Sequence, residues 1–296
     1  MREVAAAAAA GRRSQRASSP ARLILRHLRG DKVALAAIAV LALFGALALA
    51  APLLAPYDPY LAVPAQSLLP PGAAHLMGTD LLGRDVFSRV LYGARISLLV
   101  GCVSVSISAV FGVLLGLVAG YYGGFVDSVI MRLIDTLMAF PGILLALTIV
   151  ALLGPGIGNV MIAVGIGGIA NFARLVRSSV LSIREEVYVE AARSTGIRNG
   201  RIMLRHILPN ALPPVLVLGS MSYGWALLSA AGLGFLGLGA QAPSAEWGTM
   251  LSDARTLLWA APWTAVFPGL AIMCVVLVTN LLGDALRDAL DPRLRL

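Results

Sequence analysis

The sequence is poor in charge and almost without lysine. Of its 296 residues, 13% are charged and 58% are hydrophobic, whereas a soluble domain carries about 25% charged and about 45–50% apolar residues. Lys32 is the only lysine, and it lies between Asp31 and Val33 rather than in the Gly-Lys-Ser/Thr sequence of a P-loop. The composition excludes an ordinary soluble domain, and the position of the lysine excludes a Walker-type ATP site in this chain.

Side chains that carry catalysis or bind metals are also scarce. The two cysteines, Cys102 and Cys274, lie inside apolar runs, and the three histidines, His27, His75 and His206, share no ligand spacing with them or with each other. The sequence contains no paired carboxylates suited to acid–base catalysis, no HExxH helix and no GxSxG elbow. We therefore expect no catalytic residue, no metal site and no cofactor in this chain.

The apolar residues gather in runs long enough to cross a membrane. A helix needs about 20 such residues to cross the hydrocarbon core. Five runs meet that length, and a shorter, glycine-rich run with soft limits is the fourth of six. The six predicted spans are Val33–Leu54, Ile96–Gly120, Leu133–Leu153, Val160–Ala173, Leu212–Leu236 and Ala265–Ala285. The sequence therefore predicts an all-α membrane protein with six transmembrane helices.

Basic residues are divided unequally between the two sides of these spans. Nineteen of the 23 lie before Val33, between spans two and three, between spans four and five, or after span six. The other four are Arg84, Arg89, Arg95 and Arg255. The side rich in Lys and Arg is cytoplasmic by the positive-inside rule, which predicts that both termini are cytoplasmic. Because the excess charge follows the topology, we expect lipid and not nucleic acid around this chain.

The predicted topology divides the chain into five parts. In chain order they are a disordered basic cytoplasmic tail (1–32), the first transmembrane helix (33–54), an extracytoplasmic loop (55–95), a core with five transmembrane helices (96–285) and a cytoplasmic C-terminal tail (286–296). The core includes a cytoplasmic segment, residues 181–210, between the fourth and fifth spans.

Glycines and a proline inside the spans are candidates for shaping helix contacts. Gly112, Gly116 and Gly120 recur every four residues along the second span, a spacing that lets another helix approach closely. Pro141 interrupts the third span and is a candidate kink. Both features are consistent with gating and with plain packing. The deep parts of the spans hold no Asp, Glu or Lys that would mark an ion relay, which argues against proton-coupled transport.

The polar segment between the fourth and fifth spans has a helical pattern. Residues 184–194 favour a helix, and Gly196 is its expected C-cap. Residues 198–207 form a second, basic amphipathic helix that Pro209 is expected to stop before the next span. The sequence therefore predicts a cytoplasmic helix-turn-helix suited to a groove on a soluble partner. A loop lying on the lipid headgroups is the alternative.

This segment also carries a family signature, an EAA triplet followed after three residues by glycine and after ten more by an ILP triplet. Its residues are Glu190, Ala191, Ala192, Gly196, Ile207, Leu208 and Pro209. The pattern resembles the EAA signature of ABC importer permeases, and it lies in the loop before the penultimate predicted span. The resemblance implies that this segment couples the chain to an ATPase, with Glu190 as a charged anchor, two alanines that allow close approach and Gly196 at the turn.

Further blocks extend the resemblance over about residues 30 to 296. They are His75–Leu98, Gly123–Asp127 with Arg132 and Asp135, Phe235–Gly239, Trp247–Gly248 and Leu281–Pro292. These blocks look like those of peptide and nickel permeases, and the C subunit of dipeptide and oligopeptide importers is the most similar type. In the outer loops, Asp80, Arg84, Asp85 and Trp247 are candidates either to contact a binding protein or to brace the subunit.

The resemblance implies a multi-pass permease of the bacterial inner or plasma membrane that is not an enzyme by itself. Its expected partners are a second homologous permease, two P-loop ATPase subunits that bind ATP and Mg²⁺, and an extracytoplasmic substrate-binding protein. Dipeptides or short oligopeptides are the first candidate cargo, nickel or a nickel chelate is the second, and glutathione or haem are further options. An ATP-independent channel or secondary carrier is the alternative from a different class.

Overall fold

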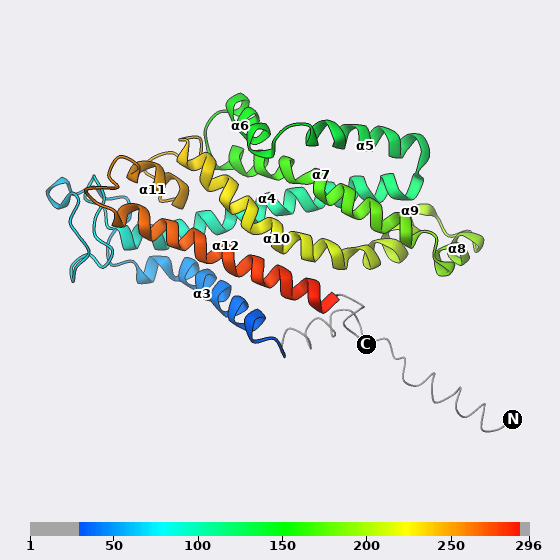
Figure 1. Cartoon of the computed structure of the whole chain (residues 1–296), viewed down its shortest axis with the longest axis horizontal. Coiled ribbons are helices and arrows are strands. Elements are labelled where there is room, and N and C mark those ends of the chain that lie inside the picture. The colour runs from blue at the N-terminus through cyan, green and yellow to red at the C-terminus, as the bar shows by residue number, and fades with distance from the viewer. Residues whose placement is uncertain (1–29, 291–296) are drawn as a thin grey trace, which may run out of the picture.

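The computed structural model describes residues 30–290, and every regular element in that range is a helix. The helices form an elongated bundle (Figure 1). In chain order they are α3 (Lys32–Leu54), η1 (Pro64–Gln66), α4 (Val86–Tyr122), α5 (Gly124–Met138), α6 (Gly142–Leu153), α7 (Ile157–Ile183), α8 (Val187–Ser194), α9 (Asn199–Ile202), the π-helical turn η2 (Met203–Ile207), α10 (Leu208–Phe235), α11 (Trp247–Ala254) and α12 (Trp263–Leu290). The predicted all-α architecture is confirmed, while most of the predicted tails 1–32 and 286–296 lies outside the described residues.

Five helices are long and apolar enough to cross a membrane. They are α3, α4, α7, α12 and the continuous helix Asn199–Phe235 that joins α9, η2 and α10. The pair α5 and α6 meets the same test together but is bent by 90° at its break. The described residues therefore hold five candidate spans, or six if the bent pair counts as one broken span.

The third predicted span is not a single helix. Pro141 lies in the break between α5 and α6 and is the N-cap residue of α6, with φ −54° and ψ 129°. Proline lacks an N–H group and disfavours the helical conformation of the residue before it. The expected kink at Pro141 is therefore a full break, at which the chain turns through a right angle.

The second and fourth predicted spans each extend ten residues further at one end in the structure. Helix α4 begins at Val86 instead of Ile96, because Asp85 caps its N-terminus by accepting the N–H of Ser88 at 2.8 Å. Helix α7 continues to Ile183 instead of ending at Ala173. Hydropathy marks where a helix is apolar, whereas capping and ion pairing decide where its polar ends stop.

The prediction that Pro209 stops a helix before the fifth span is wrong. The helix runs without a break from Asn199 to Phe235. The N–H of Leu208 donates to the carbonyl of Met203, five residues earlier, as in a π-helix. This wider turn reduces the steric clash between the ring of Pro209 and the preceding helical turn. The second arm of the polar segment and the fifth predicted span therefore form one continuous helix.

Helices α4 and α7 form the central contact of the bundle. Gly112, Gly116 and Gly120 all face α7, and a Cβ atom on any of them would lie 3.0 Å or less from atoms of residues 169–180. In return, Gly165 on α7 lies against the side chain of Ile107 on α4. The glycines let the two backbones approach closely, which is how van der Waals contact stabilises helices that lack a hydrophobic driving force in lipid.

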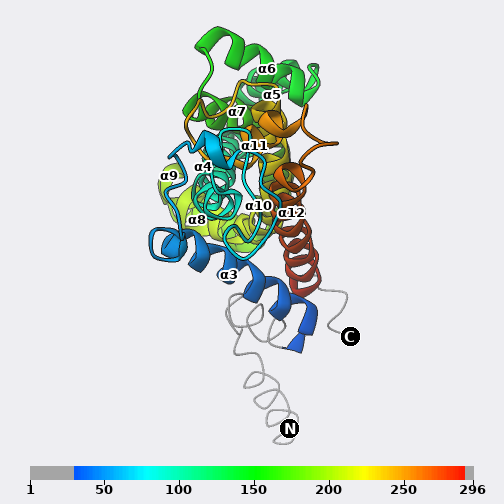
Figure 2. The same cartoon turned by 90° about the vertical axis from the view of Figure 1, so that its left-hand side faces the viewer.

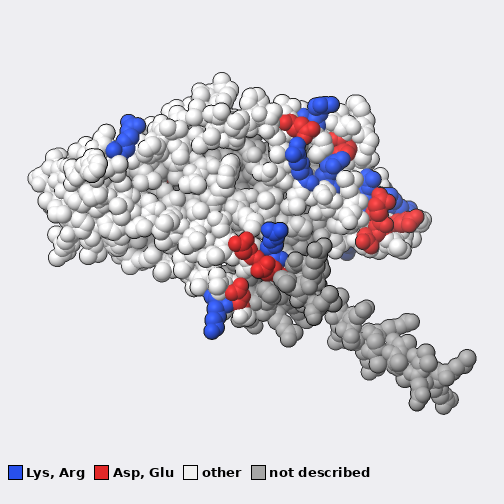
Figure 3. Space-filling model, in the orientation of Figure 1, with Lys and Arg blue, Asp and Glu red and all other residues white. Residues whose placement is uncertain are grey.

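The two ends of the bundle differ in structure and in charge. We call α8, the turn after it, α9 and η2 (residues 187–207) the bracket, and the end that holds them the bracket end. At the other end, the α11 end, lie α11 and the loop after α3; Figure 2 looks from that end and shows α4 near the centre, with α3 and the α5–α6 pair on opposite sides. On the face in Figure 3, charged side chains gather toward the bracket end and near the ends of α3 and α12, and the middle is almost free of them.

Candidate functional site

The bracket is anchored to the membrane helices by an apolar cluster. Val189 and Ala192 on α8 are 0% and 6% exposed, and Ile202 and Ile207 on the second arm are both 0% exposed. These four side chains pack in one cluster with Phe172, Val176 and Val180 of α7 and with Leu117 of α4. The bracket is therefore part of the protein core and not a loose loop.

The turn of the bracket requires glycine. Gly196 has φ +75°, and its N–H donates to the carbonyl of Arg193 at 2.9 Å while the N–H of Ile197 donates to the carbonyl of Ala192 at 3.3 Å. This pair of bonds is a Schellman motif, and Ile197 packs on the same apolar cluster as Ala192. The predicted C-cap is confirmed. No atom lies within 4 Å of a Cβ built on Gly196, so conformation and not space requires glycine here.

The seven signature residues divide into an anchored set and an exposed set. Ala192 and Ile207 are buried and Leu208 is partly buried. The exposed members are Glu190, Ala191, Gly196 and Pro209.

Two apolar side chains of the bracket are open to the surroundings as well, with Val187 78% and Leu204 61% exposed. An exposed surface that combines apolar side chains with charge on a rigid support is suited to a partner protein.

Two tyrosines, which the sequence did not reveal, tie the bracket to the membrane helices. The hydroxyl of Tyr121, near the end of α4, donates to Oδ1 of Asn199 at 2.9 Å, and the guanidinium of Arg193 lies 5.3 Å from the centre of the same ring. On the other arm, Nδ2 of Asn210 donates to the hydroxyl of Tyr188 at 3.1 Å. Partial burial, followed by the charge of Glu186, raises the pKa of Tyr188. Both helices of the bracket are thus tied to spans.

Ion pairs and a hydrogen bond hold the end of α7 that lies near the bracket. Arg174 on α7 contacts Asp135 on α5 at 2.6 Å, and Arg177 pairs with Asp127 through both of its carboxylate oxygens. Arg184, which follows α7, donates to the carbonyl of Gly120 on α4 at 2.9 Å. These contacts hold α4, α5 and α7 together where the apolar run of the sequence has already ended.

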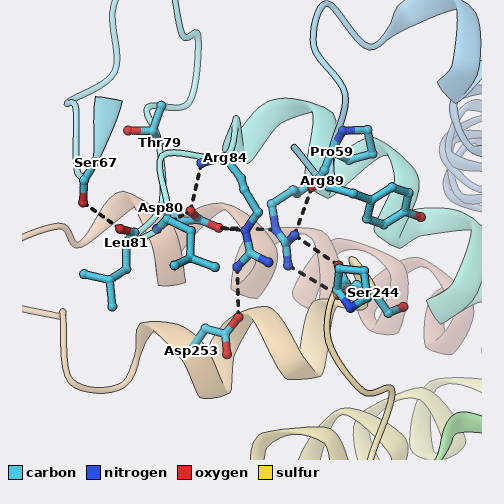
Figure 4. Close-up of polar contacts among 12 residues, drawn as sticks. Pro59, Ser67, Thr79, Asp80, Leu81, Arg84, Arg89, Ser244 and Asp253 are labelled. Carbon is cyan, nitrogen blue, oxygen red and sulfur yellow. Dashed lines mark hydrogen bonds and ion pairs between the residues drawn. The ribbon is translucent and has the colours of Figure 1, made fainter. Parts of the chain in front are cut away.

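A second polar cluster lies at the α11 end (Figure 4). Asp80 accepts from Nε of Arg84 at 2.6 Å, and its carboxylate lies 3.6 Å from Nε of Arg89. Nη2 of Arg84 also lies 3.4 Å from Oδ2 of Asp253 on α11. Arg89 is 2% exposed and donates to the backbone carbonyls of Pro59 at 3.0 Å and of Ser244 at 3.3 Å. The cluster joins the loop after α3, the start of α4 and the segment of α11.

Trp247 and Glu246 complete the contact between α4 and α11. Trp247 is 0% exposed, and its Nε1 donates to the carbonyl of Val90 at 3.0 Å. Glu246 caps α11 by accepting the N–H groups of Gly248 and Thr249 at 2.8 and 2.9 Å. Burial raises the pKa of Glu246. Its place beside Trp247 in the sequence was the available signal for this residue.

Asp85 and His75 hold the loop against the start of α4. Oδ1 of Asp85 lies 2.9 Å from Nδ1 of His75, and both residues are buried. Among residues 30–290, no group of three or more His, Cys, Asp or Glu side chains is placed to hold a metal ion. The polar contacts at the α11 end are helix capping, ion pairing and hydrogen bonds to backbone carbonyls.

Two solved structures of ABC transporters share this arrangement of helices. An inward-facing structure of the MetNI methionine ABC transporter matches with a TM-score of 0.54 at 18% identity, over 69% of this chain and 97% of that chain. A crystal structure of an amino acid ABC transporter with histidines matches with a TM-score of 0.51 at 17% identity, over 67% of this chain and 92% of that chain. At such identities the match shows the fold alone.

Sequence comparison then gives the family. Residues 112–296 match the binding-protein-dependent transport system inner membrane component, and residues 19–71 match the N-terminal TM domain of oligopeptide transport permease C. This chain belongs to the family of inner membrane components of binding-protein-dependent transport systems, that is, ABC importer permeases, which are transport components and not catalysts. The family resemblance inferred from the EAA signature is confirmed.

Two curated relatives cover most of the chain. The dipeptide transport system permease protein DppC of Alkalihalophilus pseudofirmus is 50% identical over 279 residues, which are 94% of this chain and 92% of the relative. The glutathione transport system permease protein GsiD of Pectobacterium atrosepticum is 52% identical over 225 residues, which are 76% of this chain and 75% of the relative.

Proposed function

We propose that this chain is the transmembrane permease subunit of an ATP-binding-cassette importer that carries dipeptides or short oligopeptides. An extracytoplasmic binding protein delivers the peptide to this subunit and a second, homologous permease. Two partner ATPase subunits bind ATP and Mg²⁺ and supply the energy. The observation that carries the coupling role is the bracket, in which buried Val189 and Ile202 fix the support while Glu190 and Ala191 stay exposed for a partner.

The proposed topology has six spans, with α5 and α6 as one broken span and both termini cytoplasmic. Its support is the distribution of basic residues, which gather between α7 and α10 and are few at the α11 end. In this orientation the bracket end faces the cytoplasm and the ATPases, and the α11 end faces the binding protein.

The mechanism we propose is a rigid lever. The exposed face of the bracket sits in a cleft on the ATPase, and nucleotide-driven closure displaces it. Because the helix is continuous from Asn199 to Phe235, a displacement at the bracket moves a membrane span directly. Tyr121 and Arg184 pass the same displacement to α4. A lever of this kind needs no unfolding or hinge inside the bracket.

We assign Asp80, Arg84, Asp85 and Trp247 to bracing the outer end of the subunit. All four are at most 9% exposed, and their contacts join the loop after α3, α4 and α11. Because these side chains are buried in contacts within the subunit, little of their surface is available to a partner protein. Gly112, Gly116 and Gly120 are assigned to packing by their contacts with α7, and Pro141 to the break that places α6.

Peptides are the proposed cargo because a dipeptide permease is 50% identical over 94% of this chain. Glutathione, itself a tripeptide, is the second candidate because the glutathione permease relative is 52% identical over 76% of the chain. Nickel, nickel chelates and haem remain the alternatives that the sequence left open.

Reconstitution tests this function. The assembled complex of both permeases and both ATPases, placed in proteoliposomes with its binding protein, is expected to accumulate a labelled dipeptide only with ATP and Mg²⁺ present. Unlabelled dipeptide should compete, and glutathione and Ni²⁺ are tested as competitors in the same assay. Uptake that persists without the ATPase subunits would show an ATP-independent carrier or channel instead, and competition by Ni²⁺ alone would assign the cargo to nickel.

A further inference from the structure

A cavity of about 720 Å³ lies among α5, α7, α10 and α12 toward the bracket end. Ligand sites for small molecules fall in the range of about 300–1,000 Å³. Most of its wall is apolar, including Leu175, Val217 and Leu218. Three polar side chains also line it, Asn171, Arg174 and Arg287. An apolar wall with a few polar groups is the usual composition of a binding site.

The charged groups that line the cavity are both cationic. Arg174 comes from α7 and Arg287 from the last turns of α12. Arg174 is paired with Asp135, and the two side chains are about half exposed, at 48% and 53%. No ion pair of Arg287 with another residue of the described range is present. A guanidinium binds a carboxylate through two parallel hydrogen bonds, so this wall is suited to a carboxylate.

The facing wall of the cavity contains Pro213 and Pro214 of α10. Proline has no N–H, so neither residue offers a backbone hydrogen-bond donor on this wall.

The cavity lies near the cytoplasmic boundary of the membrane in the proposed orientation. Arg174 is about 26 Å along α7 from its start at Ile157, and the hydrocarbon core is about 30 Å thick. A ligand held at this boundary is close to the side on which an importer releases its cargo.

We propose that this cavity is an inner substrate site that holds a peptide by its terminal carboxylate. Arg287 and Arg174 bind this carboxylate. Arg174 is shared with Asp135, which keeps the site weak enough to release its ligand toward the cytoplasm, as conduction through successive sites requires. This inference rests on the proposed function and adds the residues that contact the cargo.

The test measures peptide binding to the assembled permease–ATPase complex in nanodiscs, without the binding protein. The probes are a labelled dipeptide with a free carboxylate and the same dipeptide as its C-terminal amide. Arg287→Gln and Arg174→Gln are each expected to weaken binding of the free acid by about tenfold and to leave the amide unchanged. Arg132→Gln is the matched control, since Arg132 is exposed on α5 and does not line the cavity.

Three results would overturn the proposal. They are no dipeptide binding by the wild-type complex, unchanged binding in both cavity variants, or an equal loss for acid and amide. A phospholipid phosphate has similar chemistry, so nanodiscs with and without phosphatidylglycerol form a second arm. Variants that retain less of this lipid but bind the dipeptide normally would show a lipid site and reject the peptide site. Normal ATP-driven uptake by the same protein variants in proteoliposomes with the binding protein would leave the proposed function intact, so the two failures are distinguishable.

Discussion

The hydroxyl of Tyr121, next to the last residue of α4, donates to Oδ1 of Asn199, the first residue of α9, at 2.9 Å. The two residues are far apart in the sequence, and Tyr121 is only 7% exposed. The bond joins a central membrane helix to the arm of the bracket that continues into α10. It adds a polar connection to α4 to the apolar cluster that already holds the bracket against the spans.

Removing this bond should loosen the coupling without unfolding the protein. Tyr121→Phe keeps the ring, and with it the contact to Arg193, but loses the bond to Asn199. We expect a loss of about 0.5–1.5 kcal/mol in stability and fewer peptides transported per ATP hydrolysed in the reconstituted complex. Tyr122→Phe is the control, because Tyr122 is 52% exposed. An unchanged transport-to-ATP ratio in Tyr121→Phe would mean that α4 receives no movement through this bond.

Two glycines of the bracket should respond differently to alanine. Gly196 has φ +75°, where a Cβ costs about 1–2 kcal/mol, so Gly196→Ala is expected to destabilise the bracket and reduce ATP-driven uptake. Gly200 is inside α9, with open space around it and an ordinary helical backbone, so Gly200→Ala is expected to be neutral or slightly stabilising. Thermal unfolding of both purified variants checks this, and equal midpoints would reject the conformational role of Gly196.

Reversing the charge of Glu190 should affect docking and leave the fold unchanged. Glu190 is exposed, so Glu190→Lys is expected to keep the unfolding midpoint of the permease while reducing co-purification of the ATPase subunits and ATP-driven uptake. Glu185→Lys is the matched control, since Glu185 is 74% exposed and its contact is with the adjacent Arg184. If Glu190→Lys retains wild-type uptake and ATPase content, the exposed face of α8 is not the docking surface.

The close contact of α4 and α7 predicts a strong effect of one methyl group. A Cβ at Gly116 would meet the backbone oxygen of Ala173 and the side chain of Val176, so Gly116→Ala is expected to destabilise the protein by about 1–3 kcal/mol. Gly45 on α3 has nothing within 4 Å of its Cβ position, and Gly45→Ala serves as the control. The comparison is made by thermal unfolding in the same detergent. Equal stability of the two variants would mean that α4 and α7 are not in direct backbone contact.

Glu246 should make stability depend on pH at the α11 end. Burial raises its pKa in the folded state, so in the window between an unfolded pKa of about 4.3 and the raised value the folded protein binds more protons than the unfolded one. The free energy of unfolding therefore falls as pH rises through this window.

We expect the stability of the wild type relative to Glu246→Gln to increase as pH is lowered from neutral toward about 4.3. Thermal unfolding of both proteins across that range measures the difference. A difference that stays constant with pH, or decreases toward acid, would contradict a raised pKa for Glu246.

Much of the fold and the position of the bracket could be predicted from local patterns in the sequence. Long apolar runs must avoid water whatever their neighbours are, so the helical membrane class followed from composition and length. The helix end at Gly196 could be predicted as well. A helix that ends in a residue with positive φ favours glycine at that position, and this preference depends only on the few residues around it. The signature implied that Glu190 is a charged anchor, and its side chain is exposed in the structure.

The burial of individual side chains depends on neighbours that are distant in the sequence, and only the tertiary structure decided it. Ala191 and Ala192 are adjacent and identical in chemistry, yet only Ala192 packs on α7. Arg89 and Arg255 belong to the same sparse set of outer arginines, yet Arg89 is buried because backbone carbonyls of Pro59 and Ser244 converge on it. Pro141 lies at the break between α5 and α6, whereas Pro209 lies within a continuous helix. The π-helical turn before Pro209 makes room for its ring, and no such turn precedes Pro141 in α5. Composition and local conformation determined which segments enter the membrane, and long-range contacts determined which polar groups those segments bury.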